Sequence, residues 1–272
     1  MRSEPSGVHT VESLTDDLRE LGVEPGDVLL AQGSLRAVGQ VKGGGRTVVD
    51  ALREALGPRG TLVAYAATPE NSDTSRLDRE HTAGMDAAQL AEYRASMPAF
   101  DRLTTPVSRS IGRLAEEVRL TPGALRSAHP QTSFTAVGPA APAVLDGHAL
   151  ESHLGEESPT ARLYDLGARA LLIGVDLWVC TAYHLADYRA DPPPSRPYRA
   201  VLPTADGGKE WVPFQGLDID DKHFPQLVPV VARECEVLNG RFGDAECHLV
   251  PIADAVDVIE KWLIAHGRQP KN

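Results

Sequence analysis

The sequence predicts a layered α/β fold, and two stretches support that prediction. The first is an apolar run at 28–31, followed by a glycine-rich loop, a helical stripe and a second apolar run at 61–66. Strand, loop, helix and strand in this order are typical of a βαβ unit. In the second stretch, an apolar strand at 171–175 leads through a short turn into a helix expected from Thr181 to Arg189. Open α/β sheets tend to hold ligands where a strand end feeds a helix.

The first elements follow from apolar spacing. A helix is expected over 11–21, where apolar residues recur at helical spacing and Gly22 can end the helix. A turn at 25–27 then precedes the strand at 28–31. The next helical stripe runs from Val48 to Leu56, with Thr47 or a preceding glycine as its cap.

Residues 67–101 differ from the rest because acidic residues outnumber three arginines and apolar periodicity is weak. We expect an excursion over the surface with a short helix near 87–94. It is either a solvated acidic loop or a place for substrate contacts, which long loops on α/β scaffolds often provide.

Further elements are expected along the second half. We predict a helix over 109–119, a short strand at 133–138, a helix that begins at Ser158-Pro159, a strand at 209–214 and a C-terminal helix with apolar residues from Ile252 to Leu263 on one face. The proline-rich segment 191–203 cannot be helical, so it is expected to cross the surface as an extended connection.

Length, charge and cysteine content limit the classes of function that the protein can have. The chain has 272 residues, enough for a full core, and a formal charge of −11, which disfavours nucleic acid or an anionic membrane as partner. The acidic balance suits a cationic ligand, although solubility alone can explain it. No apolar stretch is long enough to span a bilayer, so a cytoplasmic location is expected. The three cysteines lack the spacing of a zinc site, and no metal is expected.

The clearest candidate for chemistry is His184, which stands three residues before Asp187 on one face of the expected helix. This pairs an imidazole with a carboxylate, although a surface histidine beside an unrelated acid is the alternative. Cys180 lies four residues before His184 and is expected to pack in the core. His148 and His153 are five residues apart, a spacing that does not favour joint metal binding.

The glycines at 43–45 lie after a strand and before a helix, where backbone N–H groups can meet an anion; a plain flexible loop is the alternative. The loop matches neither a P-loop nor a dinucleotide-binding motif, and no G-x-S-x-G elbow occurs. The sequence therefore disfavours an ATPase, a dehydrogenase or a serine hydrolase.

Several of these segments together resemble one family. The runs at 34–63, 100–141, 158–190 and 241–263 resemble the aminoglycoside 3-N-acetyltransferase family in order and spacing. The most specific pieces are His129-Pro130 followed by Ser133-Phe134, and Thr181, His184 and an acid at three-residue steps. The resemblance covers about Leu14 to Leu263.

The resemblance implies a single acetyltransferase domain over 1–272, with a variable acidic excursion at 67–101. Its fold would be a layered mixed sheet flanked by helices, distinct from GCN5-type acetyltransferases. Acetyl-CoA would be the donor, and the 3-amino group of a 2-deoxystreptamine aminoglycoside the acceptor. The implied partner is a small polycationic amine. A homodimer is one assembly that the sequence leaves open, and the charge argues against nucleic acid and membrane as partners.

Site residues carry over by motif. Seven residues would border the path of acetyl-CoA: Ser34, Leu35, Gly43, Gly44, Thr105, Ser108 and Arg109. His184 would be the general base, and its partner Asp187 departs from the glutamate usual in the family. A hydroxyl such as Thr181 could stabilise the oxyanion as the amine attacks the thioester directly.

The acidic character would attract a polycationic acceptor. Four acids are predicted to bind it: Asp73, Asp86, Asp101 and Glu157. Two alternatives stay open, namely an N-acyltransferase of the same fold with a different amine as acceptor, and a protein that sequesters a cationic antibiotic or CoA without chemistry.

Overall fold

A mixed β-sheet organises the computed structural model, which describes residues 7–190 and 192–268. In this part of the chain the sheet has seven strands, in the order β3-β4-β2-β1-β5-β9-β8. Their bounds in that order are Leu125–Arg126, Phe134–Val137, Thr61–Tyr65, Val28–Gly33, Arg169–Ile173, Ala245–Pro251 and Leu238–Phe242. The predicted mixed sheet flanked by helices is confirmed.

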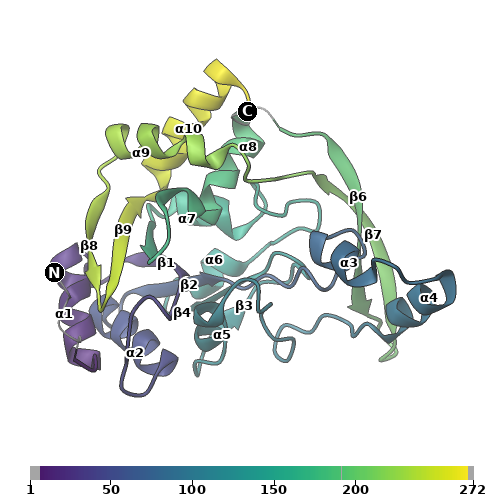
Figure 1. The fold of residues 1–272 in the computed structure, drawn as a ribbon, viewed down its shortest axis with the longest axis horizontal. Coiled ribbons are helices and arrows are strands. Elements are labelled where there is room, and N and C mark those ends of the chain that lie inside the picture. The colour runs from purple at the N-terminus through teal and green to yellow at the C-terminus, as the bar shows by residue number, and fades with distance from the viewer. Residues whose placement is uncertain (1–6, 191, 269–272) are drawn as a thin grey trace.

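Helices cover both faces of this sheet (Figure 1). One face carries α1 (Val11–Leu21), α2 (Gly45–Leu56) and α5 (Arg113–Arg119). The other carries α6 (Ala141–Leu145), α7 (Pro159–Asp165), α8 (His184–Ala190), α9 (Val228–Glu234) and α10 (Ile252–His266). Successive strand residues point to opposite faces, so Leu172 joins one apolar cluster while Leu171 and Ile173 join the other.

β1 occupies the centre of the sheet, with β2 and β5 parallel to it on its two sides. The chain leaves β1 toward β2 and returns much later to β5, so the carboxyl end of β1 is a topological switch point, where open α/β sheets form crevices. Gly33 ends β1 with φ +137°, and a Cβ there would lie 2.1 Å from the carbonyl oxygen of Ile173. Only glycine lets β1 and β5 approach so closely at this end.

A second, two-stranded sheet stands apart from the main one. β6 (Ser195–Pro203) pairs with β7 (Lys209–Leu217), and Figure 1 shows α3 (Arg76–Thr82) and α4 (Ala87–Ser96) beside this hairpin. Asn71 connects the segment after β2 to this hairpin. Its side chain accepts a hydrogen bond from the N–H of Val201 at 2.8 Å and donates one to the carbonyl of the same residue at 3.1 Å. The expected helix near 87–94 is confirmed, whereas α3 was missed.

Three expectations about element bounds were wrong. The helix expected from 109 begins at Arg113, because the Ser108 hydroxyl accepts from the N–H of Ser110 and stabilises a turn instead. The strand expected to reach 175 ends at Ile173, where pairing with β9 stops. The expected connection 191–203 contains β6, and Pro197 is tolerated because a two-stranded sheet consists of edges.

The helix expected from Thr181 is divided. Thr181–Tyr183 forms a 3₁₀ turn, η2, and α8 starts only at His184. Two further 3₁₀ turns are η1 (Leu177–Val179), directly after the loop that leaves β5, and η3 (Phe224–Gln226) before α9. Among the described residues, no helix has both the length and the apolar character needed to cross a membrane.

Candidate active site

A cavity of about 700 Å³ opens at the carboxyl ends of the central strands. Gln32 and Gly33 line it from the end of β1 and Ser34 from the position after it, Tyr65 lines it from the end of β2, and the loop after β5 also contributes to its wall. The cavity therefore lies at the switch point, as expected from the strand-to-helix segment around β5. Its wall also includes His184, Thr181, Leu35 and Cys180.

His184 and Asp187 form a hydrogen-bonded pair. Nδ1 of His184 lies 2.9 Å from Oδ2 of Asp187. The shorter aspartate side chain therefore reaches the imidazole directly. An ionised carboxylate has only acceptors, so the proton of a neutral His184 belongs on Nδ1, and Nε2 keeps its lone pair.

Two further basic side chains, those of His223 and Arg268, contact the carboxylate of Asp187. Its Oδ1 lies 3.0 Å from Nε2 of His223 and 3.0 Å from Nε of Arg268. Only 1% of the Asp187 side chain is exposed. Burial by itself would raise the pKa of this carboxyl, but the hydrogen bonds and charges of His184 and His223 outweigh burial and hold it well below its usual range. Asp187 is therefore an anion.

Thr181 is positioned by Gln32 at the end of β1. The backbone N–H of Thr181 donates to Oε1 of Gln32 at 3.0 Å, which fixes the orientation of the amide. Nε2 of Gln32 must then donate to the Thr181 hydroxyl, at 2.6 Å. Because the hydroxyl oxygen accepts this bond, the hydroxyl proton stays available to a group in the cavity.

A second cavity, of about 900 Å³, adjoins the first, and Gly112 and Arg113 line both. Thr105, Ser108 and Arg109 line the second cavity. Ser108 donates to Glu70 at 2.5 Å. Predicted acetyl-CoA contacts are thus divided, with Ser34 and Leu35 on the first cavity and these three residues on the second.

Comparison with known proteins decides the family. The family model described as aminoglycoside 3-N-acetyltransferase matches residues 30–264. Aminoglycoside N(3)-acetyltransferase III of Salmonella sp is 41% identical over 95% of this chain and 93% of its own length. This chain belongs to the aminoglycoside 3-N-acetyltransferase family.

Solved structures of family members share the fold. YokD of Bacillus subtilis matches with a TM-score of 0.89 and 32% identity, over 96% of this chain and 95% of that one. AAC-VIa bound to sisomicin matches with 0.82 and 32%, over 95% and 98%. The binary complex of AAC-IIIb with CoASH matches with 0.83 and 29%, over 98% and 100%.

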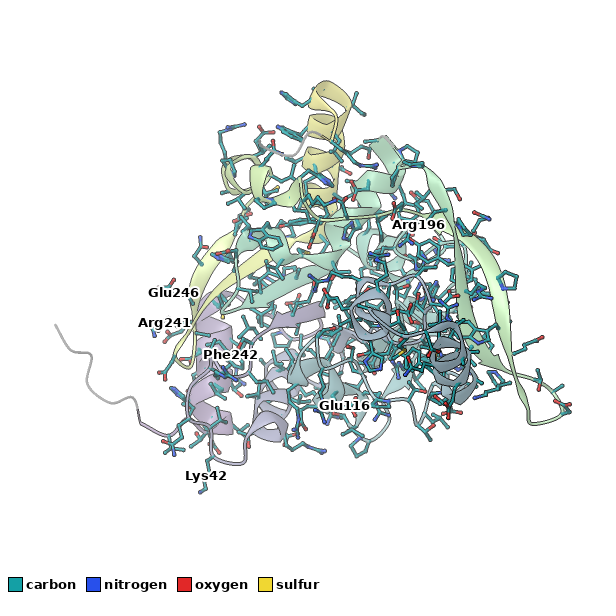
Figure 2. All side chains as sticks on the ribbon, turned by 45° about the vertical axis from the view of Figure 1, so that its right-hand side comes forward. Lys42, Glu116, Arg196, Arg241, Phe242 and Glu246 are labelled. Carbon is teal, nitrogen blue, oxygen red and sulfur yellow. The ribbon has the colours of Figure 1, made fainter. Side chains whose placement is uncertain are left out.

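Two predicted acetyl-CoA contacts of this family member lie apart from the others. Gly43 and Gly44 belong to the loop before α2, with Gly44 as the N-cap, and they line neither cavity. Figure 2 labels the neighbouring Lys42, which projects from that loop at the lower edge of the molecule. Their role in binding acetyl-CoA stays a prediction.

The four acids predicted to bind substrate do not line the cavity that holds His184. Asp73 is almost buried and ion-pairs with Arg199. Asp86 caps α4, and Asp101 accepts from the N–H groups of Leu103 and Thr104 in its own turn. Glu157 is exposed beyond the cavity. Sequence reasoning missed Asp221, which does line it.

Cys180 is fully buried, and burial raises the pKa of its thiol to about 12. The thiol therefore stays protonated near neutral pH and cannot serve as a nucleophile, although it touches the cavity. This fits the expectation that Cys180 packs in the core.

Three buried histidines form a separate cluster. The ring of His129 lies 4.8 Å from that of His148 and 4.7 Å from that of His153. Burial lowers the pKa of His148 to about 4 and that of His153 to about 3, and lowers that of His129 as well. The three are neutral at pH 7. In the described part of the chain, no group of three or more histidine, cysteine or acidic side chains is arranged to hold a metal ion.

Proposed function

We propose that this chain transfers the acetyl group of acetyl-CoA to the 3-amino group of a 2-deoxystreptamine aminoglycoside. The observation that carries the proposal is the His184–Asp187 pair on the wall of a cavity at the switch point, in a member of this family. The relatives support both substrates, since one was solved with CoASH and another with sisomicin.

The proposed reaction begins with a proton transfer. An aminoglycoside amine is largely protonated near neutral pH and must lose a proton before or during attack. Nε2 of neutral His184 accepts this proton, and the anionic Asp187 on Nδ1 stabilises the imidazolium that forms. The amine nitrogen then bonds to the acetyl carbon, and the C–S bond breaks with its electron pair leaving on sulfur. The nitrogen loses its second proton as the amide forms; of the two protons released, one goes to the CoA thiolate and the other to solvent.

The developing oxyanion needs a hydrogen-bond donor. The Thr181 hydroxyl suits this role, because Gln32 occupies its oxygen and leaves its proton available. The thioester is already activated, so no covalent acyl-enzyme is required. The buried, protonated Cys180 is in keeping with direct transfer.

The cavities offer groups that suit each substrate. Arg36 and Arg113 on the first cavity and Arg109 on the second are cations that fit the phosphates of acetyl-CoA. Asp221 is an exposed carboxylate on the first cavity and fits an ammonium group of the acceptor. Asp73, Asp86, Asp101 and Glu157 would contribute to the negative electrostatic field that attracts a polycation.

We place the reaction in the cytoplasm, because all three cysteines are free thiols.

The test is to incubate the protein with acetyl-CoA and a panel of amines while following release of the CoA thiol. Release with deoxystreptamine aminoglycosides, and a product acetylated at the 3-amino position by NMR, supports the proposal. Release of the CoA thiol only with other amines favours an N-acyltransferase of the same fold that uses a different amine as acceptor. Binding of aminoglycoside without thiol release favours sequestration, and both of these results overturn the proposal.

A further inference from the structure

Two residues from the last third of the chain meet on the carboxylate that holds His184. Arg268 follows α10, and Figure 1 shows the end of that helix close to α8. Its Nε lies 3.0 Å from Oδ1 of Asp187, and its Nη2 donates to the backbone carbonyl of the same residue at 2.7 Å. His223, just before η3, brings Nε2 to 3.0 Å from the same Oδ1.

We propose that Arg268 and His223 are positioning residues for acetyl transfer, which act on His184 through Asp187. The inference rests on the proposed function, because it takes His184 as the base. Neither residue lines the cavity that His184 faces, so neither is expected to touch a substrate there.

The geometry divides the two carboxylate oxygens between two tasks. Oδ1 accepts a hydrogen bond from Arg268 and lies 3.0 Å from Nε2 of His223, while Oδ2 lies 2.9 Å from Nδ1 of His184. The hydrogen bond from Arg268 to Oδ1, with the buried ring of His223 packed against the same oxygen, restricts rotation of the carboxylate and keeps Oδ2 aimed at the imidazole. Arg268 also binds the backbone of Asp187, so the first turn of α8 is fixed along with the side chain.

The turn that carries His223 also packs on the base itself. The ring of Phe224 lies 4.6 Å from the ring of His184. His184 is thus confined between Asp187 on one side and Phe224 on another, and neighbouring residues 223 and 224 contact both members of the pair. Small errors in the position of a catalytic group can cost about a hundredfold in rate.

Charge balance gives Arg268 a second effect. The charged and titratable groups that face Asp187 are His184, His223 and Arg268; Asp218, Asp220 and Lys222 line the adjacent cavity of about 320 Å³. The permanent charge of Arg268 offsets that of Asp187. The carboxylate can then orient the imidazole without being a buried charge that nothing else compensates.

The experiment follows the titration of His184 by NMR in ¹⁵N-histidine-labelled protein, together with kcat and KM. In Arg268→Met we expect the His184 titration midpoint to rise, because a nearby positive charge is lost. We also expect kcat to fall about tenfold to a hundredfold while the KM for acetyl-CoA changes less than about twofold. Arg268→Lys keeps the charge and is expected to restore the midpoint, with kcat only partly recovered.

The matched control is Arg189→Met. Arg189 belongs to α8 itself, but its guanidinium is paired with Glu156 and not with Asp187. This variant should leave the His184 titration unchanged. His223→Phe keeps a ring in place and removes the contact to Oδ1, so it tests the inference should Arg268→Met fail to fold. An unchanged midpoint in folded Arg268→Met overturns the inference. So does a shifted midpoint with unchanged kcat.

The titration separates this inference from the proposed function. If His184→Ala retains acetyl transfer, the base assignment fails, and the positioning role for the reaction falls with it. If His184→Ala is inactive while Arg268→Met and His223→Phe leave both titration and kcat untouched, only the positioning inference fails.

Discussion

Gln32 and Thr181, 149 positions apart in the chain, hold each other by two hydrogen bonds at the mouth of the central cavity. In one bond the N–H of Thr181 donates to the side-chain oxygen Oε1 of Gln32, and in the other Nε2 of Gln32 donates to the Thr181 hydroxyl. Together they tie the turn before α8 to the end of β1. A hydroxyl with a free proton thereby lies on the same cavity wall as the imidazole of His184.

The hydroxyl of Thr181 can be removed without changing the shape of the side chain. We expect Thr181→Val to lower kcat by about a hundredfold to a thousandfold, the cost of removing one oxyanion donor. Thr181→Ser keeps the hydroxyl and should stay near wild-type activity. Steady-state kinetics with saturating acetyl-CoA measures both, and equal kcat in the two variants would exclude the hydroxyl from the reaction.

His184→Ala removes the proposed base. We expect the rate of acetyl transfer to fall by about a hundredfold to ten-thousandfold, because positioned acid–base groups contribute that much. Folding and CoA binding should stay near normal, since within residues 7–190 and 192–268 the imidazole is hydrogen-bonded to Asp187 alone and lies on the cavity wall. Thermal melting and calorimetric titration with CoA check both. Turnover near the wild-type rate in the folded variant would remove His184 from the mechanism.

Asp187→Asn keeps the size of the side chain and removes its charge. The amide can offer a donor to His184, which favours the tautomer with the proton on Nε2 and blocks proton acceptance there. We therefore expect turnover to slow much more than CoA binding weakens. Comparison of kcat with the dissociation constant for CoA tests this, and a wild-type kcat would mean that another group orients His184.

The buried histidine cluster predicts acid sensitivity. An unfolded histidine has a pKa of about 6.5, whereas burial in the folded chain lowers the pKa of His148 to about 4 and that of His153 to about 3. Below about pH 6.5 the unfolded state binds more protons, so the stabilisation present above that pH is lost as pH falls toward the folded values.

His153→Phe tests that linkage, because His153 lies among rings and its Nε2 has no hydrogen-bond partner in the described chain. We expect the variant to reduce the slope of unfolding free energy against pH by up to about 1.4 kcal/mol per pH unit, the value for one proton. Urea unfolding between about pH 6 and pH 5 measures the slope. The exposed His266→Gln is the control, and an identical slope in His153→Phe contradicts the prediction.

Asp221 is the carboxylate that the fold brings to the cavity. We expect Asp221→Asn to raise the KM for the polycationic acceptor and to leave the KM for acetyl-CoA unchanged, with a smaller effect at high salt because screening weakens the attraction. Glu157→Gln compares an acid predicted from the sequence, and Asp16→Asn on α1 serves as a distant control. A larger effect from Glu157→Gln than from Asp221→Asn would reverse the assignment.

Local pattern was sufficient for much of the fold. The helix at 11–21 follows from its apolar spacing and from Gly22, which takes φ +102° as a left-handed cap. The strands β1, β2 and β5 follow from short apolar runs. Local pattern misled the prediction where a side-chain hydrogen bond competes with regular structure, as at Ser108, and where pairing with a distant strand decides the outcome, as at 195–203.

The sequence by itself determined the family and the pairing of His184 with Asp187, because three residues along a helix are near neighbours whatever surrounds them. Tertiary structure alone decided what holds that pair. His223 with its neighbour Phe224, and Arg268, reach the pair from two separate segments, while Gln32 positions Thr181 from a third, and no local spacing relates these residues to His184. Tertiary structure also decided which acid lines the cavity, because the local sequence around an acidic residue does not show where its side chain lies in the folded chain.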